Sequence, residues 1–297
     1  MLNRQKRGQI ENEDLFPFKN YSRDDLLAIL NSKNPQMRTI AVYSLAKYKD
    51  ETTIYILVDK FKTEKALYTR LAISQTLVGF GEIAIPYLIE LLGRIGNNHE
   101  KTLPSKYFNK KSFPLPRDLA ARTIANYGEI AIPYLIEILN KNVDDKNDLF
   151  IKQQTIDAIG AIVYKSNNSN NFIYLKGVHS LLENILDLFD DILENNTFDV
   201  NKKYSETHVL IWKILRSLSG FKKNEFALDL IFYILCSCDF DYNDEYFYPF
   251  YWEAIRSIGQ IGINSNETTE FLDSFEDFDN IHVNKALEIA KWSLNIK

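Results

Sequence analysis

The sequence predicts an all-α chain, an α-solenoid of about six to seven helix pairs, from three observations. The string GEIAIPYLIE occurs twice, at Gly81–Glu90 and Gly128–Glu137. A helical pattern of apolar residues recurs around a leucine-like position along the chain. Only 8 prolines and 11 glycines occur among 297 residues, and no alternating strand pattern competes. Because one helix pair cannot bury its apolar stripe alone, such pairs are expected to stack into a continuous core.

The first helix of each pair is predicted by its leucine-like residue, which we call the anchor. The residue before each anchor is small, and mostly apolar residues lie four positions before it and three after it. These offsets fall on one face of a helix, and the small residue allows a neighbouring helix to approach closely. A last partial copy is KALEIAKWSL. The six anchors are Leu45, Leu77, Ile124, Ile159, Leu218 and Ile258.

The anchor spacings predict the domain organisation. They are 32, 47, 35, 59 and 40 residues, whereas a two-helix unit needs roughly 30–47 residues. The longer gaps are therefore expected to hold insertions. We expect an N-terminal tail over 1–20 and a single solenoid over 21–297. Within the solenoid, an insertion is expected over 96–116, and an Asn-rich loop with an extra helix over 165–205.

The repeated string has the chemistry of a corner between two helices. Gly81 and Gly128 can take the left-handed conformation that ends a helix. Pro86 and Pro133 fall in the first turn of the next helix, where no backbone hydrogen bond is lost. The string is therefore explained by packing geometry, and within it only the tyrosines are candidates for touching a ligand.

The pattern R-x-x-A-x-x-[small]-L-x-x-[aromatic]-G-x-x-A-I-P-x-L-I resembles a HEAT repeat, specifically the HEAT-like type named after phycobilisome lyases. The match is strongest from about Asn34 to Lys141. The resemblance implies an armadillo-like helical solenoid whose second helices line a concave surface. It also implies a structural role for the basic residue seven positions before the anchor, which pairs with a carboxylate or a helix-end carbonyl of the neighbouring repeat. Those residues are Arg38, Arg70, Arg117 and Lys152.

A stripe on the second helices is a candidate partner-binding surface. Tyr55, Tyr87 and Tyr134 align between copies, and basic residues follow each of them by seven positions. Residues seven apart share nearly the same helix face, so the pattern predicts a tyrosine ladder beside a basic ladder, suited to an acidic partner. The alternative is that the tyrosines are half-buried packing residues. The basic residues are Lys62, Arg94 and Lys141.

The insertion 96–116 is a second candidate surface. Together with Arg94 and Arg117 on its flanks it carries six basic residues with interleaved aromatics and prolines, and long loops in compact repeats are often functional. Such a loop can bind phosphate groups, nucleic acid or an acidic protein segment. The alternative is that its aromatics pack back over the edge of the solenoid. The residues assigned to binding are Lys106, Tyr107, Lys110 and Lys111.

Charge and cysteine usage constrain the setting. The net charge is −5, divided into +7 up to Ala125 and −12 after it. Such asymmetry can mark an interaction surface, although a charge run is also often only a solvated face. Cys236 and Cys238 stand two apart on a predicted helix, where a disulfide is geometrically unfavourable, and no apolar segment reaches membrane-spanning length. A cytoplasmic protein with no membrane partner is expected.

No catalytic motif is present in the sequence. HExxH, CxxC, P-loop and GxSxG motifs are absent, and His99–Glu100 is the one His-Glu pair. We therefore expect no catalytic residues, no metal and no cofactor. The leading hypothesis is a non-enzymatic scaffold for protein–protein interaction, whose partner carries an acidic segment. Two alternatives stay open from the resemblance: nucleic-acid binding of the alkylpurine DNA glycosylase type, and a bilin-lyase-like assembly factor.

Overall fold

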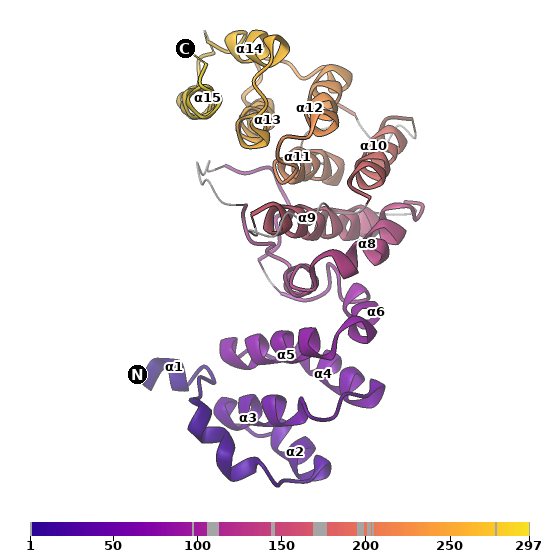
Figure 1. Cartoon of the computed structure of the whole chain (residues 1–297), viewed down its shortest axis with the longest axis vertical. Helices are drawn as coiled ribbons and strands as arrows, with labels where there is room; N and C mark the ends of the chain where they lie inside the picture. The colour runs from indigo at the N-terminus through magenta and orange to yellow at the C-terminus, as the bar shows by residue number, and fades with distance from the viewer. Residues whose placement is uncertain are drawn as a thin grey trace. The chain divides into compact units, whose positions relative to one another are not determined.

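The computed structural model describes residues 2–96, 98–105, 113–143, 146–168, 177–194, 199–200, 203, 205–276 and 278–296. Every regular element in these ranges is an α- or 3₁₀-helix, so the all-α prediction is confirmed (Figure 1). None of the described helices is long and apolar enough to cross a membrane. The chain divides into two compact units, Met1–Gly96 and Asn97–Lys297, which we call the N-terminal and C-terminal units. The prediction of one solenoid over 21–297 stays a prediction.

The N-terminal unit contains two layers of helices. In the first layer α3 packs against α5; in the second, α4 packs against α6, while α2 covers α3. Side-chain caps begin several helices, as where Asp50 accepts a hydrogen bond from the Thr53 amide. The elements are α1 (Leu2–Gln5), η1 (Asn12–Phe18), α2 (Arg23–Leu30), α3 (Pro35–Leu45), α4 (Glu51–Thr63), α5 (Leu67–Phe80), η2 (Glu82–Ala84) and α6 (Ile85–Ile89).

The predicted tail is packed against the ends of two first-layer helices. The Tyr68 amide donates to the Arg7 carbonyl at 3.0 Å, and the Gln36 side chain donates to the Gln9 carbonyl at 2.8 Å. Gly8 lies at φ +92°, and a Cβ there would come within 2.8 Å of the Thr69 hydroxyl. Glycine therefore permits both the backbone conformation and the close approach of the tail.

The C-terminal unit also has two layers of helices. Successive first-layer helices α7, α9, α11, α13 and α15 pack side by side, and α10 packs between α8 and α12 in the second layer (Figure 1). The elements are α7 (Leu119–Ile124), η3 (Gly128–Ala131), α8 (Ile132–Leu139), α9 (Lys146–Asn168), α10 (Val178–Glu194), α11 (Glu206–Leu218), α12 (Glu225–Cys238), η4 (Glu245–Phe247), α13 (Tyr248–Ile261), α14 (Asn266–Asp273) and α15 (Ile281–Leu294).

The position of α10 differs from what the sequence suggested for 165–205. An extra helix was expected there, but α10 takes the place of the ordinary second helix between α8 and α12. One side of α10 is apolar, as a helix packed between two others requires, and it is buried. It includes Leu181, Ile185, Leu188 and Phe189. The long anchor spacing therefore comes from connecting segments, which lie partly outside the described residues.

All six anchors lie on first-layer helices, and all six anchor residues are 0% exposed. This is expected if the helix face that carries the anchor packs against the other layer. The anchors thus give one common frame for comparing repeats. We number positions backward from the anchor, so that position −2 is two residues before it.

Both copies of the repeated string form the predicted corner. Each begins with a 3₁₀ turn, and Pro86 and Pro133 occupy the first turns of α6 and α8. Gly81 and Gly128 both have positive φ, at 79° and 68°. The ψ of Gly81 is −158°, so it lies outside the left-handed helical region that the sequence suggested.

Candidate binding pocket

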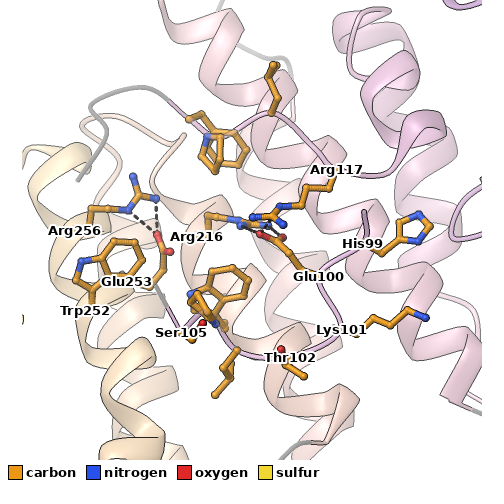
Figure 2. Close-up of a pocket in the computed structure, with 16 residues that line it drawn as sticks. His99, Glu100, Lys101, Thr102, Ser105, Arg117, Arg216, Trp252, Glu253 and Arg256 are labelled. Atoms are coloured by element: carbon orange, nitrogen blue, oxygen red, sulfur yellow. Dashed lines mark hydrogen bonds and ion pairs between the residues drawn. The ribbon is translucent and has the colours of Figure 1, made fainter. Parts of the chain in front are cut away.

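A pocket of about 680 Å³ lies in the C-terminal unit, on the outer side of the first-layer helices α11 and α13 (Figure 2). One wall is formed by two helices and the other by the insertion, whose described parts are 98–105 and 113–116. The lining side chains on the helices are Trp212, Arg216, Trp252, Glu253 and Arg256. Those from the insertion side include His99, Glu100, Lys101, Thr102, Ser105, Phe113 and Arg117.

The two helices present the same pair of residue types to the pocket. Trp212 precedes Arg216 by four positions, and Trp252 precedes Arg256 by four, so each pair shares a helix face. The guanidinium of Arg216 lies 4.4 Å from the centre of the Trp212 ring, and that of Arg256 lies 5.7 Å from the Trp252 ring. Each tryptophan therefore supports its arginine by a cation–π contact.

A buried ionic network joins α9, α11 and the insertion beneath the pocket. Lys213 donates to Asp157 at 2.8 Å, and Arg216 also pairs with Asp157. Arg216 grips Glu100 with two hydrogen bonds, at 2.8 and 3.2 Å. Arg117 reaches the same carboxylate at 3.2 Å. The acidic residue of the insertion is thus held by cations from two elements, as the dashed lines in Figure 2 show in part.

The charges in this network keep one another ionised. Burial alone would raise the pKa of Asp157, but the charges of Arg216 and Lys213 outweigh it and hold that pKa below its usual range. Burial alone would lower the pKa of Arg216, but the carboxylates of Asp157 and Glu100 raise it. A buried charge without such partners would be strongly unfavourable, so the network is a unit.

A second ion pair lies on the α13 side of the pocket. Arg256 donates to Glu253, three residues earlier on the same helix, at 2.8 Å from its Nε. Glu253 is 1% exposed and Arg256 is 8% exposed. In Figure 2 this pair and Trp252 stand across from the Arg216–Glu100–Arg117 group.

The described parts of the insertion are firmly attached to the C-terminal unit. His99 contacts Asp118 at 2.8 Å, and its ring meets the edge of Phe150 with centroids 5.2 Å apart. Phe113 is 8% exposed and lies over Gly160, where a Cβ would clash with its ring at 2.4 Å. These parts therefore pack back on the helices. The predicted binding residues Lys106, Tyr107, Lys110 and Lys111 lie outside the described residues.

Two buried donors beside the pocket have no hydrogen-bond acceptor among the described residues. They are the indole N–H of Trp212 and the Nε–H of Arg216, on residues that are 3% and 5% exposed. An unsatisfied buried donor carries a desolvation cost of about 1–3 kcal/mol. Both residues line the pocket, but these two atoms are themselves buried.

The lining chemistry fits an anionic ligand with an apolar or aromatic body. Four basic side chains, Lys101, Arg117, Arg216 and Arg256, stand against two acidic ones, Glu100 and Glu253. Tryptophan, phenylalanine, proline and leucine supply the apolar walls. Within the described residues there is no group of three or more His, Cys, Asp or Glu side chains placed to hold a metal.

The tyrosine and basic stripe predicted on the second helices is only partly formed. Tyr55 is 62% exposed on α4, and Lys62 is exposed on the same helix, 3.8 Å from Asp59. Tyr87 and Tyr134 are half-buried. Helix α6 ends at Ile89 and α8 ends at Leu139.

Those early helix ends correct the stripe. Arg94 and Lys141 are exposed but lie beyond the ends of α6 and α8, so the seven-residue spacing does not place them on a common helical face with the tyrosines. The cause is local: tight turns such as Arg94 N–H to Leu91 carbonyl, at 3.0 Å, replace the helix. The same-face argument holds for α4 alone.

The four basic residues seven positions before the anchors make different contacts. Arg38 forms a two-pronged pair with Glu64, at 2.7 and 2.8 Å, beside the end of α4. The Nζ of Lys152 donates to the Leu139 carbonyl, which ends α8, at 2.6 Å. Arg117 pairs with Glu100. The half-buried Arg70 has an Nε without a partner among the described residues.

The insertion and Arg117 were singled out from the sequence, but the pocket residues on α11 and α13 were not identified, although a signal was present. The Trp-x-x-x-Arg pairs recur at positions −6 and −2 of consecutive repeats, and Asp157 occupies position −2 of the repeat before them. When the first helices of successive repeats carry polar residues at the same position, those residues lie next to one another in the stack and form one surface. The partner carboxylate, Glu100, could not have been assigned because it comes from a loop 116 residues away from Arg216.

Comparison with known proteins adds little to this geometry. No protein-family model and no curated protein matches the chain. Among solved structures, the chain is similar to the complex of CpcE and CpcF of phycocyanin lyase from Nostoc sp. PCC7120, with 16% identity, 96% of this chain and 99% of that chain covered, and a TM-score of 0.31. It is also similar to a computationally designed self-assembling cyclic homo-oligomer, with 15% identity, 95% and 94% coverage, and a TM-score of 0.17. At these scores neither likeness bears on function.

Proposed function

We propose that this protein is a non-enzymatic helical-repeat scaffold, and that the pocket of its C-terminal unit receives an acidic segment of a partner protein. The observation that carries the proposal is the pair of tryptophan-supported arginines, Arg216 and Arg256, opening on one pocket. Arginine over an aromatic ring is typical of surfaces that bind carboxylates, because the planar guanidinium offers paired donors.

The donors of the pocket favour a carboxylate. Lys101 and Arg117 are the more exposed cations of the lining, and carboxylate oxygens accept several hydrogen bonds each. Ser105 and Thr102 add hydroxyls on the insertion side. A cavity of about 680 Å³ has room for a few side chains rather than a folded domain. A short acidic and aromatic segment is therefore the best-fitting ligand.

The same features weigh against nucleic acid as the ligand of this pocket. Tracking a phosphate backbone requires an extended basic surface. Here Glu100 and Glu253 neutralise part of the basic charge, and the cavity is local. The glycosylase-type and bilin-lyase-like hypotheses remain predictions from the sequence resemblance.

The proposal is tested with a fluorescein-labelled decapeptide of alternating glutamate and tyrosine, measured by fluorescence anisotropy. A decapeptide of lysine and tyrosine is the ligand control. Arg256→Lys keeps the charge but loses the planar fork, so we expect binding to weaken by about fivefold or more, which is ~1 kcal/mol. Glu253→Gln removes the competing negative charge while keeping a hydrogen-bond acceptor for Arg256, so binding is expected to tighten.

Lys62→Ala serves as the matched control, since it removes a basic charge from the α4 stripe and leaves the pocket intact. We expect no change in peptide affinity. Loss of binding on Lys62→Ala with no effect of either pocket variant would move the site to α4. Equal binding of the acidic and basic peptides would refute the proposed recognition.

A further inference from the structure

Helix α15 is held tightly against α13 on one side. Its inner face includes Val283, Ala286 and Ala290, which are 0–2% exposed. Gly259 on α13 allows the closest approach, since a Cβ there would lie 2.9 Å from the Cα of Ala290. The Ser293 hydroxyl adds a hydrogen bond to the Gly259 carbonyl at 3.0 Å. The helix is thus fixed in position and rotation, so its opposite face is presented in a defined way.

That opposite face carries an exposed stripe with an apolar residue at each end. Ile281 is 77% exposed, Ile289 is 38% exposed and Trp292 is 71% exposed. Lys285 and Glu288, which lie between the ends, are also exposed. At 3.6 residues per turn these five positions fall within roughly 100° of the helix surface. They therefore form one continuous stripe, which we call the α15 stripe.

The α15 stripe combines large exposed apolar side chains with two charged ones. Exposed apolar groups rimmed by polar residues mark sites of protein interaction. Trp292 in particular belongs to the residue types enriched where proteins contact one another.

The order of residues along the α15 stripe makes it complementary to itself. When two copies of the helix lie antiparallel about a two-fold axis between Ala286 and Leu287, Lys285 of each copy comes level with Glu288 of the other. Ile281 of each copy likewise comes level with Trp292 of the other. The match follows from equal spacing of both pairs about the same midpoint. Two such contacts of each kind arise, as in any two-fold interface.

We propose that α15 pairs antiparallel with α15 of a second copy of this chain, so that the protein forms a homodimer through the α15 stripe. The charge pairs fix the register, and the isoleucine and tryptophan contacts supply the apolar burial. The surface involved is small, so the dimer is of the weak, concentration-dependent class. None of the stripe residues lines the pocket, so this proposal and the proposed function fail separately.

The test is a charge-reversal cycle followed by sedimentation velocity, with protein from about 5 to 500 µM to span a weak association. The wild-type protein is expected to shift from monomer to dimer across this range. Lys285→Glu alone and Glu288→Lys alone each place like charges opposite one another, so each is expected to weaken dimerisation by about tenfold or more. The double variant restores opposite charges and is expected to recover the wild-type association.

Three results would overturn the proposed pairing, and the double variant distinguishes it from a general loss of contact. A wild-type monomer throughout the concentration range overturns the proposal, as does association that the single reversals leave unchanged. Failure of the double variant to recover also overturns it, because a general loss of contact rather than the predicted pairing would then explain the singles. All four proteins should give the same circular dichroism, since both positions are exposed.

A second measurement addresses the pairing directly. Unlabelled and nitrogen-15-labelled protein are mixed and treated with a zero-length carbodiimide cross-linker. We expect a mixed-isotope link between Lys285 of one copy and Glu288 of the other in the mass spectrum. Dimer that forms without this mixed link would contradict the antiparallel register.

Discussion

The two units share one repeat frame but fill position −2 with different chemistry. In the N-terminal unit this position holds Tyr43 and Gln75, and the Tyr43 hydroxyl donates to the Gln75 side chain at 2.6 Å near the surface. In the C-terminal unit it holds the half-buried Arg122 and three buried residues, Asp157, Arg216 and Arg256, which are 1%, 5% and 8% exposed. The same place in the repeat is thus a neutral surface contact in one unit, whereas three of its four residues in the other unit form buried ion pairs.

The difference shows what the insertion does to the surface beneath it. Residues 98–105 and 113–117 cover the outer side of α11 and α13, so polar groups there lose water. Buried charges persist only when paired. Glu100 supplies part of that pairing from the insertion itself, in contact with Arg216. The repeat frame therefore decides the core, whereas the insertion decides the chemistry of the outer face.

The largest expected effect comes from breaking the buried network. Asp157→Asn removes the charge that partners both Lys213 and Arg216, which are 1% and 5% exposed. We expect the free energy of unfolding to fall by about 3–5 kcal/mol, as for other buried pairs that lose one member. Urea unfolding followed by tryptophan fluorescence measures it, since all three tryptophans lie in the C-terminal unit: Trp212, Trp252 and Trp292.

The matched variant at the same register position is Gln75→Ala in the N-terminal unit. Because Gln75 is exposed, the expected change is within about 0.5 kcal/mol, measured by circular dichroism. If Asp157→Asn lowered the free energy of unfolding by less than about 1 kcal/mol, the buried network would contribute little to stability. The two units would then not differ in the energetic importance of position −2.

The second expected effect is a selective weakening of the C-terminal unit by mild acid. All four histidines lie after Gly96. His208 is 0% exposed, and burial lowers its pKa to about 4, while its Nδ1 contacts the Tyr246 hydroxyl at 2.9 Å. In the unfolded chain His208 takes up a proton near pH 6.5, whereas in the folded chain it stays neutral down to about pH 4. Its contribution to the free energy of unfolding is therefore fully present above about pH 6.5 and decreases as the pH falls towards 4.

At about pH 4 the protonation of His208 is expected to have lowered the free energy of unfolding by about 3 kcal/mol, because one pKa unit corresponds to about 1.36 kcal/mol. His208→Gln cannot titrate, and its unfolding free energy should change less between about pH 6.5 and pH 4.5 than that of the wild type. His282→Gln, at an exposed position, is the control and should retain the wild-type slope. Identical slopes for all three proteins would exclude His208 as the source.

The sequence predicted the parts of this molecule that depend on local periodicity. The anchors are buried because a pattern of −4, 0 and +3 is a property of one helix. It did not assign the partner of Arg216 because Glu100 comes from the insertion, where no periodic rule applies. Charge counts did not locate the pocket either, because its basic side chains are divided between the two parts: Lys101 and Arg117 precede Ala125, whereas Arg216 and Arg256 follow it.

Helix ends were the other limit of prediction. Arg94 and Lys141 were placed on helical faces by counting seven residues, but the helices stop before them. Such ends depend on whether the following residues gain more from tight turns and packing than from another helical hydrogen bond. Leu91 and Leu92 are 2% and 0% exposed after α6 has ended, so their burial shapes that segment.

A third, smaller effect tests the ion pair of the N-terminal unit. Burial alone would raise the pKa of Glu64, but the hydrogen bonds from Arg38 help to hold it below its usual range. Glu64 also accepts hydrogen bonds from the amides of Lys65 and Ala66. Arg38→Met leaves this carboxylate buried without its cation, and we expect a loss of about 2–3 kcal/mol near pH 7.

The sign of the pH dependence sharpens that test. Since the pKa of Glu64 is lowered, its contribution is present above the ordinary glutamate pKa and is lost as pH falls. The gap between wild type and Arg38→Met should therefore narrow on acidification, as followed by hydrogen exchange of α4 and α5. Arg23→Ala breaks a pair with Asp50 that is more accessible, with side chains 31% and 44% exposed, and should cost less, about 1 kcal/mol. Equal costs for the two arginines would contradict the assignment.

The smallest expected effect compares the two copies of the repeated string. A Cβ at Gly128 would have no neighbour within 4 Å, and one at Gly81 would meet only the Lys49 Nζ at 3.9 Å. Alanine at either place is therefore opposed by the backbone alone. Gly128 has φ +68°, for which alanine costs about 1–2 kcal/mol. Gly81 combines φ +79° with ψ −158°, a region essentially limited to glycine, so its alanine variant should cost more, up to about 3 kcal/mol.

Hydrogen exchange of the peptides around each corner measures the two costs separately. Asparagine discriminates further, because it tolerates the left-handed helical region but not the conformation of Gly81. Gly128→Asn should thus recover part of the stability lost in Gly128→Ala, whereas Gly81→Asn should recover none. Equal recovery at both sites would mean that identical strings adopt the same backbone in the two units. The contrast between the units would then begin only at the insertion.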